Sequence, residues 1–590
     1  MELIFFVFMF FYPLFMAVYW ITGSLLFFFR WEGQQKTPEL KRHPTVAILV
    51  PCHNEQTSIG DVIRQLAANH YPSIEIIAIN DGSTDSTGDI LNKLGAEVPQ
   101  LKVVTLTRNY GKAAALRMGV LATSAEYVMC IDADALLEKD ALFWMMSQFE
   151  DSPRVGAVTG NPRVVNDKSL LGRIQIGEFS AIVGMVKRTQ RSVGRVFTVS
   201  GVNACFRTAA LHDVGYWSSE TVTEDIDISW KLQLRRWDIR FEPRALTWIL
   251  VPEKFNALWR QRLRWAQGGY EAEVKFGRDI FRWKNRRMWV VSLEYWMSVL
   301  WCYALVFSVV CWAATNTLPS DLWPEVLRVP TLLPGWTGVI LAVVCLLQFT
   351  VGLIIDRRYE RRGLIKHTFW AIWYPAGYWF LSAATTVVAI PKGMLAKRKQ
   401  ARHALWVSPK RTLLTMPQWV RERRKESEQR SYFWKIIPQP EKMLEAAIMF
   451  VSWGLWAYFI TPLLSLALWY AGVALFADRM ITPTSLETVV DAYGYGVAIL
   501  TMWLCLALWI TWNQTRYGRR NRRSGGPSAI TAEQAGAYFG LSLSQVNYMR
   551  AEKQIALHLD EHDHPVIETA VRSDNVYSIA ASGGTSMAGA

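Results

Sequence analysis

Two places in the sequence bring carboxylates close together beside apolar segments. Asp132-Ala133-Asp134 follows the apolar run 127–131, and Thr223-Glu224-Asp225 precedes the amphipathic segment 226–234. Two carboxylates this close repel each other unless a cation lies between them. Asp132 and Asp134 therefore predict a site for Mg²⁺ or Mn²⁺ to which a diphosphate adds further oxygen ligands. A lone pair of this spacing also occurs by chance in loops.

Asp225 and Glu224 are candidate catalytic carboxylates. Asp225 has the chemistry of a general base that takes the proton of an acceptor hydroxyl, and Glu224 precedes it directly. The same residues also suit the start of a helix, with Thr223 or Asp225 as its cap. The sequence leaves both interpretations open.

Polar residues follow two successive apolar runs. The run 46–50 ends in Pro51-Cys52-His53-Asn54-Glu55, and the run 74–79 ends in Asn80-Asp81-Gly82-Ser83-Thr84-Asp85. Ligands bind at the carboxyl ends of parallel strands, so Pro51, Asn54, Glu55 and Asp81 are candidates for nucleotide binding. Either segment alone suits an ordinary strand-to-helix turn. Their occurrence on successive strands favours nucleotide binding.

A lysine and a tryptophan motif supply the remaining candidates. Lys112, in Gly111-Lys112-Ala113, could place a positive charge on the diphosphate or be a solvated surface lysine. The motif Gln261-Arg262-Leu263-Arg264-Trp265 lies in a segment with a wide apolar face, which also suits a helix at a membrane interface. Trp265 could stack on a sugar ring and hold the acceptor end. Arg264 could stabilise a departing diphosphate.

Alternating strands and helices are predicted to position these side chains. The apolar runs 46–50, 74–79, 103–106 and 127–131 alternate with helical patterns such as 58–68. This alternation predicts a parallel α/β sheet in a soluble domain from Thr45 to about Arg287.

The composition indicates a membrane protein whose charges lie on one side. The 590 residues are 51% hydrophobic and include 28 Trp, yet the formal net charge is +14. A nucleic-acid-binding protein could share this charge but would not need the apolar segments. Five segments are predicted to span a membrane: 4–29, 289–314, 335–355, 446–470 and 495–512. Segment 4–29 lacks the basic start and cleavage site of a signal peptide, so it is interpreted as an anchor.

The segment 368–390 is harder to interpret. It is apolar but broken by Pro375, and a span here would put Lys392 and the basic residues after it outside. A re-entrant or interfacial segment removes this conflict, and we favour it over a span. The seven Cys residues form no CxxC pair or metal-ligand spacing, which predicts a cytoplasmic soluble part without disulfides.

The order of the motifs along the chain resembles the processive family-2 glycosyltransferases, which include cellulose, chitin and hyaluronan synthases. That resemblance implies a GT-A fold. It further implies that Asp81 contacts uracil and that Asp134 is the main metal ligand beside Asp132. Ser200-Gly201-Val202-Asn203 would line the acceptor pocket, which makes Gly201 and Asn203 candidates for substrate binding. Asp225 would be the base, and Gln261, Arg264 and Trp265 would form the signature that accompanies processivity.

A closer resemblance divides the chain into two parts. From about Phe10 to Pro409 it is similar to the catalytic subunit of bacterial poly-β-1,6-N-acetylglucosamine synthases (PgaC/IcaA type), for example in Arg264-Trp265-Ala266-Gln267-Gly268-Gly269. After about Ser431 it resembles the small accessory membrane subunit, PgaD. The resemblance implies a synthase and its accessory subunit in one chain, located in the bacterial inner membrane with the catalytic domain in the cytoplasm. UDP-N-acetylglucosamine would be the donor, and envelope export or deacetylase proteins are further implied partners. One departure is a single span before the catalytic domain, where family members often have two.

The predicted domains follow from these patterns. They are an N-terminal membrane helix (1–30), a cytoplasmic GT-A domain (31–287), a transmembrane or re-entrant region (288–392), a basic linker (393–440), a PgaD-like membrane hairpin (441–515) and a basic cytoplasmic tail (516–590) whose end is disordered.

The resemblance also implies activation by cyclic di-GMP, without a PilZ signature. Arginines that bridge phosphates and stack on bases would have to bind it. The candidates close the predicted hairpin: Arg516, Arg519, Arg520, Arg522 and Arg523. They could face Arg357, Arg358, Arg361 and Arg362 across the ligand, or contact anionic lipid heads as a topology signal.

Three other functions remain alternatives. A related polymerase of the chitin or hyaluronan type would share every motif. A non-processive transferase that charges a lipid carrier would share the GT-A motifs but would not need the tryptophan motif. A membrane-anchored nucleic-acid-binding regulator could use residues 530–550 as a helix-turn-helix, but it leaves the carboxylate motifs unexplained. We expect no nucleic-acid polymer as a partner.

Overall fold

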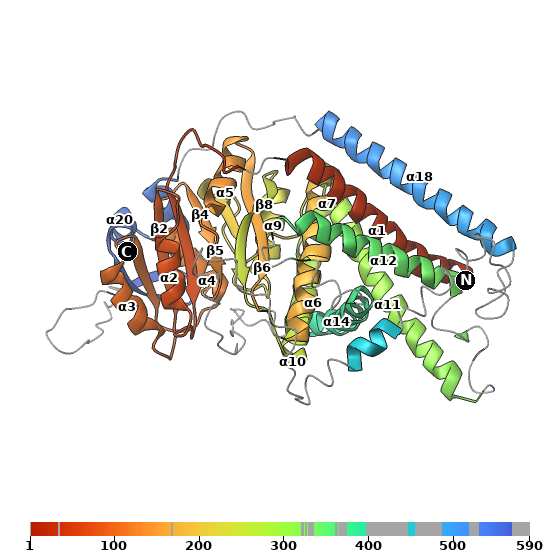
Figure 1. The fold of residues 1–590 in the computed structure, drawn as a ribbon. Coiled ribbons are helices and arrows are strands. Elements are labelled where there is room, and N and C mark those ends of the chain that lie inside the picture. Colours follow the sequence, from red (N-terminus) through yellow and green to blue (C-terminus); the bar gives the residue numbers. More distant parts are fainter. Residues whose placement is uncertain are drawn as a thin grey trace, which may run out of the picture.

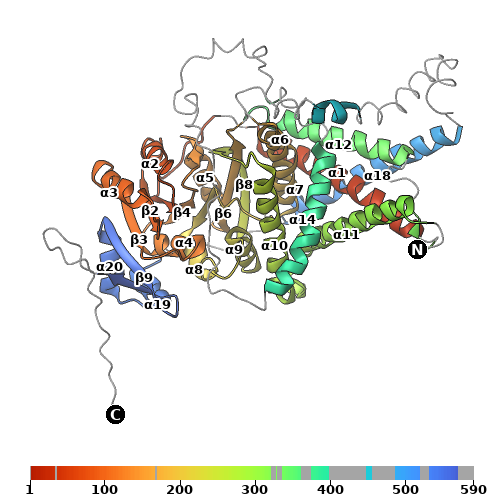
Figure 2. The same cartoon turned by 90° about the horizontal axis from the view of Figure 1, so that it is seen from below.

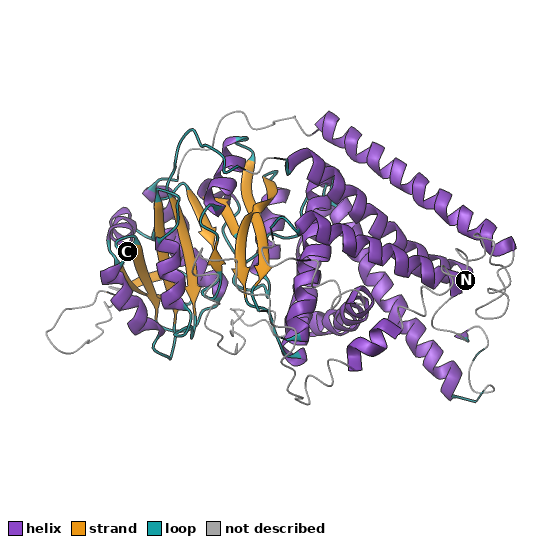
Figure 3. Ribbon diagram, viewed as in Figure 1, coloured by secondary structure: helices purple, strands orange, loops and turns teal. Residues whose placement is uncertain are grey.

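The computed structural model describes residues 2–33, 36–166, 169–319, 324, 327–328, 335–359, 364, 374–396, 447–454, 486–517 and 530–568. One half of the molecule contains a sheet with flanking helices, and the other half is helical (Figure 1). Colouring by secondary structure separates the two halves, because the strands lie together at one end (Figure 3).

The described part of the chain forms one sheet of ten strands, in the order β10-β9-β3-β2-β1-β4-β7-β6-β8-β5. Their bounds are β1 (Val46–Cys52), β2 (Ile74–Asp81), β3 (Leu101–Leu106), β4 (Tyr127–Cys130), β5 (Leu136–Leu137), β6 (Val155–Val164), β7 (Ala204–Arg207), β8 (Asp238–Ile249), β9 (Gln554–Leu559) and β10 (Pro565–Glu568). β1 pairs in parallel with β2 and β4, and β2 with β3. The four predicted strands are thereby confirmed, and the motifs after β1, β2 and β4 meet at one edge.

Helices cover both faces of this sheet. They are α2 (Ile59–Ala67), α3 (Thr87–Glu97), α4 (Lys112–Leu121), α5 (Ala141–Glu150), α6 (Leu170–Glu178), α7 (Met185–Val193), α8 (Thr208–Asp213), α9 (Glu224–Leu234) and α10 (Phe255–Ile280). A π-helical segment, η1 (Phe179–Gly184), joins α6 to α7. Successive side chains of a strand point to opposite faces. In β1, Ile48 and Val50 therefore pack toward α2 and α5, while Leu49 packs toward α4.

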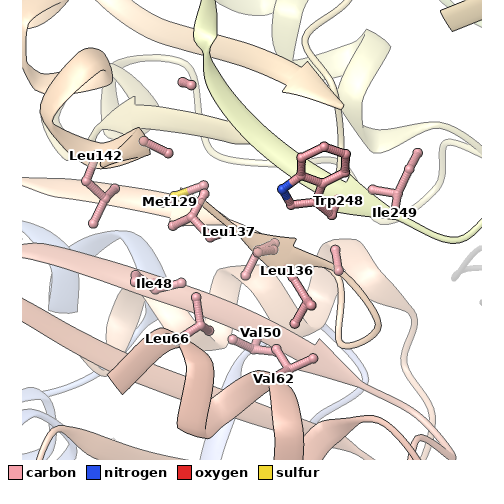
Figure 4. Packing of buried hydrophobic residues seen from close by; sticks show 14 of the residues in the cluster. Ile48, Val50, Val62, Leu66, Met129, Leu136, Leu137, Leu142, Trp248 and Ile249 are labelled. Carbon is pink, nitrogen blue, oxygen red and sulfur yellow. The ribbon is translucent and has the colours of Figure 1, made fainter. Parts of the chain in front are cut away.

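The core on the α2 side contains large aliphatic side chains and the indoles of Trp144 and Trp248. Ile48 and Val50 of β1 contact Val62 and Leu66 of α2, and Trp248 of β8 closes the cluster (Figure 4). Burying each of these side chains stabilises the fold by roughly 1.5–3 kcal/mol. This packing holds the edge that carries the motifs.

The helical half contains α1 (Glu2–Trp31), α11 (Trp289–Thr317), α12 (Gly335–Asp356), α14 (Tyr374–Ala396) and α18 (Leu486–Tyr517). Within the described residues, two helical stretches are long and apolar enough to cross a membrane, Phe8–Trp31 and Trp289–Thr317. Ile340–Asp356 and Ile499–Trp512 are shorter apolar stretches. In the segment 446–470, residues 447–454 are helical, and the rest lies outside the described residues.

The described part of the segment 368–390 belongs to α14, from Tyr374 onward. Residues 368–373 lie outside the described residues, so the break at Pro375 stays a prediction. The helix packs along α10 and α11. Whether it spans or re-enters the membrane stays a prediction.

A buried ion cluster joins the two halves. Arg188 of α7 donates to Glu32, just after α1, at 2.6 Å and to Asp356 at the end of α12 at 2.7 Å. Arg163 of β6 donates to the other oxygen of Asp356 at 2.7 Å, and Tyr359 donates to Glu32 at 2.6 Å. The side chains of Arg188, Glu32 and Asp356 are 0% exposed.

The C-terminal part of the chain forms a folded unit on the sheet edge (Figure 2). This C-terminal unit comprises residues 530–568 with α19 (Ala532–Phe539), α20 (Leu543–Ala551), β9 and β10. Capping boxes start both helices, Thr531 with Gln534 and Ser542 with Gln545. The apolar faces of the two helices join the core on the α4 side. The residues considered as a helix-turn-helix are therefore packed into the sheet domain.

Candidate functional site

A large cavity opens at the carboxyl edge of the sheet and continues between the helices. Its volume is about 1790 Å³. It is lined at the sheet end by predicted site residues: Lys112, Asp132, Asp134, Gly201, Glu224, Asp225, Gln261, Arg264 and Trp265. The structure therefore brings together residues that lie up to 153 positions apart in the sequence.

Lys112 lies at the centre of the carboxylates. Its Nζ is 2.6 Å from Oδ1 of Asp132, 3.2 Å from Oε1 of Glu224 and 3.2 Å from the carbonyl oxygen of Gly201. Burial lowers the pKa of Lys112, but Asp132 and Glu224 outweigh it and raise the pKa well above its ordinary value. The lysine is a buried permanent cation, not the solvated surface lysine of the alternative interpretation.

The loop before Lys112 is held by Asp81. One oxygen of Asp81 accepts from the backbone N–H of Tyr110 at 2.8 Å, and the other accepts from that of Gly111 at 2.9 Å. Asp81 is 1% exposed. Gly82 has φ +60°, and a Cβ there would approach the backbone of Arg108 to 2.3 Å, so only glycine fits. Asp81 thus fixes the loop that carries Lys112.

Asp225 has the electrostatic environment expected of a general base. Burial and the neighbouring Glu224 raise the pKa of Asp225 to about 6, against the opposing effect of Lys112 and Arg264. A base is most effective when its pKa lies near the working pH. Thr223 caps α9 without a side-chain hydrogen bond, and Asp225 lies within the first turn.

The tryptophan motif faces the cavity from α10. Arg262 stacks over the Trp265 ring at 4.1 Å and pairs with Oε1 of Glu178 at 2.7 Å. Trp265 remains 37% exposed, so Arg262 and Glu178 hold an indole that is still open to the cavity. A Cβ on Gly268 would meet Oγ1 of Thr223 at 1.9 Å, so glycine lets α10 pack against the loop before Glu224.

The two loops after β1 and β2 are joined to each other. Asn54 donates its N–H to Oγ of Ser83 at 3.0 Å and accepts from the N–H of Thr84 at 2.8 Å. Glu55 donates its N–H to Oγ1 of Thr87 at 2.9 Å. Pro51 is buried within β1. None of these residues is among the side chains that line the described cavity.

Gly201 lines the cavity, whereas Asn203 is buried inside the fold. A Cβ on Gly201 would lie 3.4 Å from Asp225, so a glycine leaves room for an acceptor there. Asn203 is 0% exposed, and its Nδ2 donates to the carbonyl of Ala245 at 2.9 Å. Asn203 is not among the residues that line the cavity, and its contact with substrate stays a prediction.

Sequence reasoning missed Lys187. It lines the cavity from α7, is 7% exposed and donates to Oγ1 of Thr159 at 3.4 Å. Burial lowers the pKa of Lys187 to about 8, although Asp225 opposes the shift. Its burial follows from tertiary packing, so the local sequence held no signal for it.

Asp132 and Asp134, the predicted metal ligands, lie on the same cavity. Asp134 is 7% exposed and lines the cavity with Asp132. Among the described residues, no group of three or more His, Cys, Asp or Glu could hold a metal ion. Mg²⁺ and Mn²⁺ sites often use one or two carboxylates and substrate phosphates instead of a full protein cage. The pair fits a metal whose remaining ligands come with a diphosphate.

Comparison with known proteins defines the two parts of the chain. Residues 43–268 match the model for glycosyltransferase like family 2, and residues 435–566 match that for PgaD-like protein. The chain is 39% identical over 410 residues to a poly-β-1,6-N-acetyl-D-glucosamine synthase of Staphylococcus epidermidis, an alignment that covers 68% of this chain and 98% of the relative. It is 40% identical over 412 residues to the poly-β-1,6-N-acetyl-D-glucosamine synthase of Staphylococcus aureus (strain COL), and this alignment covers 69% of the chain and 98% of that relative.

This chain belongs to the poly-β-1,6-N-acetylglucosamine synthase family. The predicted enzyme class, a family-2 glycosyltransferase, and the predicted GT-A fold are confirmed. The presence of a PgaD-like region in this synthase chain is confirmed as well.

Two solved structures are distantly similar to this synthase-family chain. One is the mannosyltransferase PcManGT of Pyrobaculum calidifontis with GDP-Man and Mn²⁺, at TM-score 0.46 and 20% identity over 65% of this chain and 99% of that one. The other is Staphylococcus aureus TarS 1-349 with UDP-GlcNAc, at TM-score 0.31 and 16% identity over 60% and 92%.

Proposed function

We propose that this chain polymerises N-acetylglucosamine from UDP-N-acetylglucosamine into poly-β-1,6-N-acetylglucosamine and exports the product. The printed activity of relatives that align over 98% of their length supports this substrate and product. The observation that carries the proposal is the cavity itself, which joins the carboxylate cluster to an interior lined by membrane-type helices.

Asp225 acts as the base in the proposed reaction. It takes the proton of the acceptor hydroxyl while that oxygen attacks C1 of the donor sugar, and the bond from C1 to UDP breaks with inversion at C1. The raised pKa of Asp225, about 6, suits this task near neutral pH. Lys112 and Arg264 lie on the same cavity, where their positive charge can balance the departing diphosphate. Asp81, through its loop, is proposed to lie next to the uracil.

Asp132 and Asp134 are proposed to hold Mg²⁺ or Mn²⁺ together with the diphosphate. A bound divalent ion would supply counter-charge to the leaving group. Asp134→Ala should abolish both activity and the response to added metal, and EDTA should abolish the activity of the unchanged chain. Full turnover in EDTA would contradict this assignment.

Export is proposed to follow the helical part of the cavity. Aromatic residues of α1, α11 and α14 line it beyond Trp265: Tyr12, Trp20, Tyr295, Trp301, Tyr378 and Trp379. Aromatic faces bind sugar rings without fixing a single position, which suits a chain that moves. Glu294 of α11 lies in the same cavity and accepts from Trp20 and Gln190, each at 3.3 Å. An ionisable residue in an apolar helix usually marks a pathway.

An inner-membrane location with a cytoplasmic catalytic domain is part of the proposal. The two helical stretches able to cross a membrane, Phe8–Trp31 and Trp289–Thr317, support it. Contacts with lipids follow from their exposed apolar side chains, such as Leu293, Leu300 and Val310.

Activation by cyclic di-GMP is also proposed. Of the arginines first considered, Arg516 lies in α18, and Arg519, Arg520, Arg522 and Arg523 lie outside the described residues. A second cavity of about 980 Å³ offers described partners. Arg235, Arg236, Arg240 and Arg286 of the catalytic part line it together with Arg30 of α1 and Trp509 of α18. Guanidinium groups bind phosphates, and an indole stacks on bases.

Regulation can be tested by UDP release with and without cyclic di-GMP. The dinucleotide should accelerate the intact chain. Arg235→Ala with Arg286→Ala should weaken that response, and Arg519→Ala with Arg520→Ala tests the site first considered. Equal activity with and without the dinucleotide, together with no binding in calorimetry, would remove the regulatory proposal.

The substrate and product can be tested with membranes that contain the chain. They should make polymer from UDP-N-acetylglucosamine in preference to other UDP-sugars, and a β-1,6-specific glycanase should digest it. Polymer cut only by chitinase or hyaluronidase would favour a related polymerase. A single sugar on a lipid would favour the lipid-carrier transferase.

A further inference from the structure

The C-terminal unit (530–568) is built into the edge of the catalytic sheet. β9 pairs in parallel with β3, from Val103 opposite Gln554 to Leu106 opposite Leu557. The N–H of Val103 donates to the carbonyl of Lys553 at 2.8 Å. The buried Lys102 donates from Nζ to the carbonyl of Arg550 at 2.7 Å. The unit therefore covers an edge that would otherwise be open.

The end of β9 reaches the loop of Asp81 and Lys112. The phenol oxygen of Tyr110 accepts from the N–H of Leu559 at 3.1 Å and donates to the carbonyl of Leu559 at 3.4 Å. Tyr110 is 3% exposed and is followed by Gly111 and Lys112. Its own N–H donates to Asp81. Beside the backbone bond from Thr107 to Leu557, the Tyr110 hydroxyl thus joins the C-terminal unit to the loop that carries the central lysine.

The turn after β9 makes a second contact near the proposed base. Oγ of Ser219 donates to Oδ2 of Asp563 at 3.3 Å. Ser219 lines the large cavity and lies four positions before Thr223, which precedes Glu224 and Asp225. The same unit therefore contacts segments on both sides of the carboxylate cluster.

We propose that the C-terminal unit positions the nucleotide-sugar loop, with Tyr110 as the positioning residue that transmits its docking to Asp81 and Lys112. Because residues 530–566 of this unit fall in the PgaD-like match, the accessory part of the chain would act directly on donor binding as well as through its membrane helices. The inference rests on the proposed function, since it takes a nucleotide sugar as the ligand of this loop.

A unit that only closes the sheet edge would stabilise the fold without affecting the donor. Only a unit that positions the donor loop should change the KM for UDP-N-acetylglucosamine when its contact with that loop is lost. Loss of the Tyr110 hydroxyl in Tyr110→Phe keeps the ring in the core but frees the loop from Leu559. The KM for UDP-N-acetylglucosamine should rise about threefold to tenfold, the range for one lost hydrogen bond, while kcat for UDP release changes less than about twofold.

Tyr538→Phe is the matched control. Its hydroxyl also joins the C-terminal unit to the catalytic domain, by donating to the carbonyl of Gly215 at 2.9 Å, but away from the donor loop. It should leave KM unchanged. A wild-type KM in Tyr110→Phe, or the same rise in both variants, would overturn the proposal.

A second variant tests the other contact, and a binding readout separates this inference from the function. Asp563 has φ +62°, which glycine adopts without strain, so Asp563→Gly removes the carboxylate that accepts from Ser219 without straining the turn. This variant should also raise the KM for UDP-N-acetylglucosamine, and an unchanged KM would overturn the role of this turn.

The affinity for UDP, measured by calorimetry, should fall in Tyr110→Phe whichever sugar the chain polymerises. A chain that binds UDP but makes no polymer would refute the proposed function alone.

Discussion

Two clusters of buried charge lie on either side of α7, and they differ in balance and in access. In the junction cluster, Glu32 and Asp356 are matched by Arg188 and Arg163, and all four side chains are at most 1% exposed. In the cavity cluster, Lys112 faces Asp132 and Glu224, with Asp225 beside them. There the carboxylates exceed the cation that pairs with them.

This difference separates a structural cluster from a reactive one. Balanced ion pairs without solvent access hold two halves together and have no capacity left for a ligand. A cluster with excess negative charge on a cavity raises the pKa of one carboxyl and attracts cations or hydroxyl protons. Burial of charge alone does not indicate function.

The largest expected effect is on turnover at the cavity cluster. Asp225→Asn keeps the shape but removes the proton acceptor, so kcat should fall by about 10²–10⁴-fold, the range for a lost general base. UDP affinity and the melting temperature should stay near those of the unchanged chain. Polymer synthesis near the original rate would remove Asp225 from the mechanism.

A substitution in the junction cluster should lower the stability of the fold and leave turnover unchanged. Arg188→Met leaves two buried carboxylates without their shared partner, which should destabilise the fold by about 3–5 kcal/mol. Thermal unfolding in detergent measures this loss, and the molecules that remain folded should keep their kcat. The control is Arg42→Met at the exposed pair with Glu126, where about 1 kcal/mol or less is expected. Equal effects of the two substitutions would contradict the structural role.

Much of the catalytic half could be predicted from local sequence. Apolar runs ending in polar motifs identified β1, β2 and β4, and parallel pairing necessarily brought Asp81, Lys112 and Asp132 to one edge. The motif order also pointed to Asp225 and Trp265, which the structure places on the same cavity.

The rest depended on tertiary packing. Ile555, Leu557 and Leu559 alternate as in a strand, but nothing local says that β9 pairs with β3, some 450 residues earlier in the chain. The same limit applies to Asn203. Its motif suggested that it binds substrate, but its side-chain Nδ2 donates to the carbonyl of Ala245. The positions of Lys187 and Arg262 depend on contacts with other elements, Thr159 of β6 and Glu178 of α6, which the local sequence does not specify.

A smaller effect is expected at the acceptor side of the cavity. Trp265→Ala removes the indole that Arg262 holds toward the cavity, so chain elongation should decrease by about tenfold, in line with the loss of one stacking contact. UDP release by hydrolysis should decrease less, because the UDP contacts are proposed to lie elsewhere. A strictly proportional fall in UDP release and polymer yield would contradict an acceptor-specific role.

The pH dependence of polymer synthesis at saturating donor tests the central claim most directly. Only ionised Asp225 can accept a proton, and its pKa is raised to about 6. The rate should therefore be constant above about pH 7 and fall tenfold per pH unit below 6. Glu273 of α10 is the control, because burial raises its pKa to about 7. Glu273→Gln should leave the fall in rate below pH 6 unchanged. A rate that is constant from pH 5 to 8, or a fall that disappears in Glu273→Gln, would contradict Asp225 as the base.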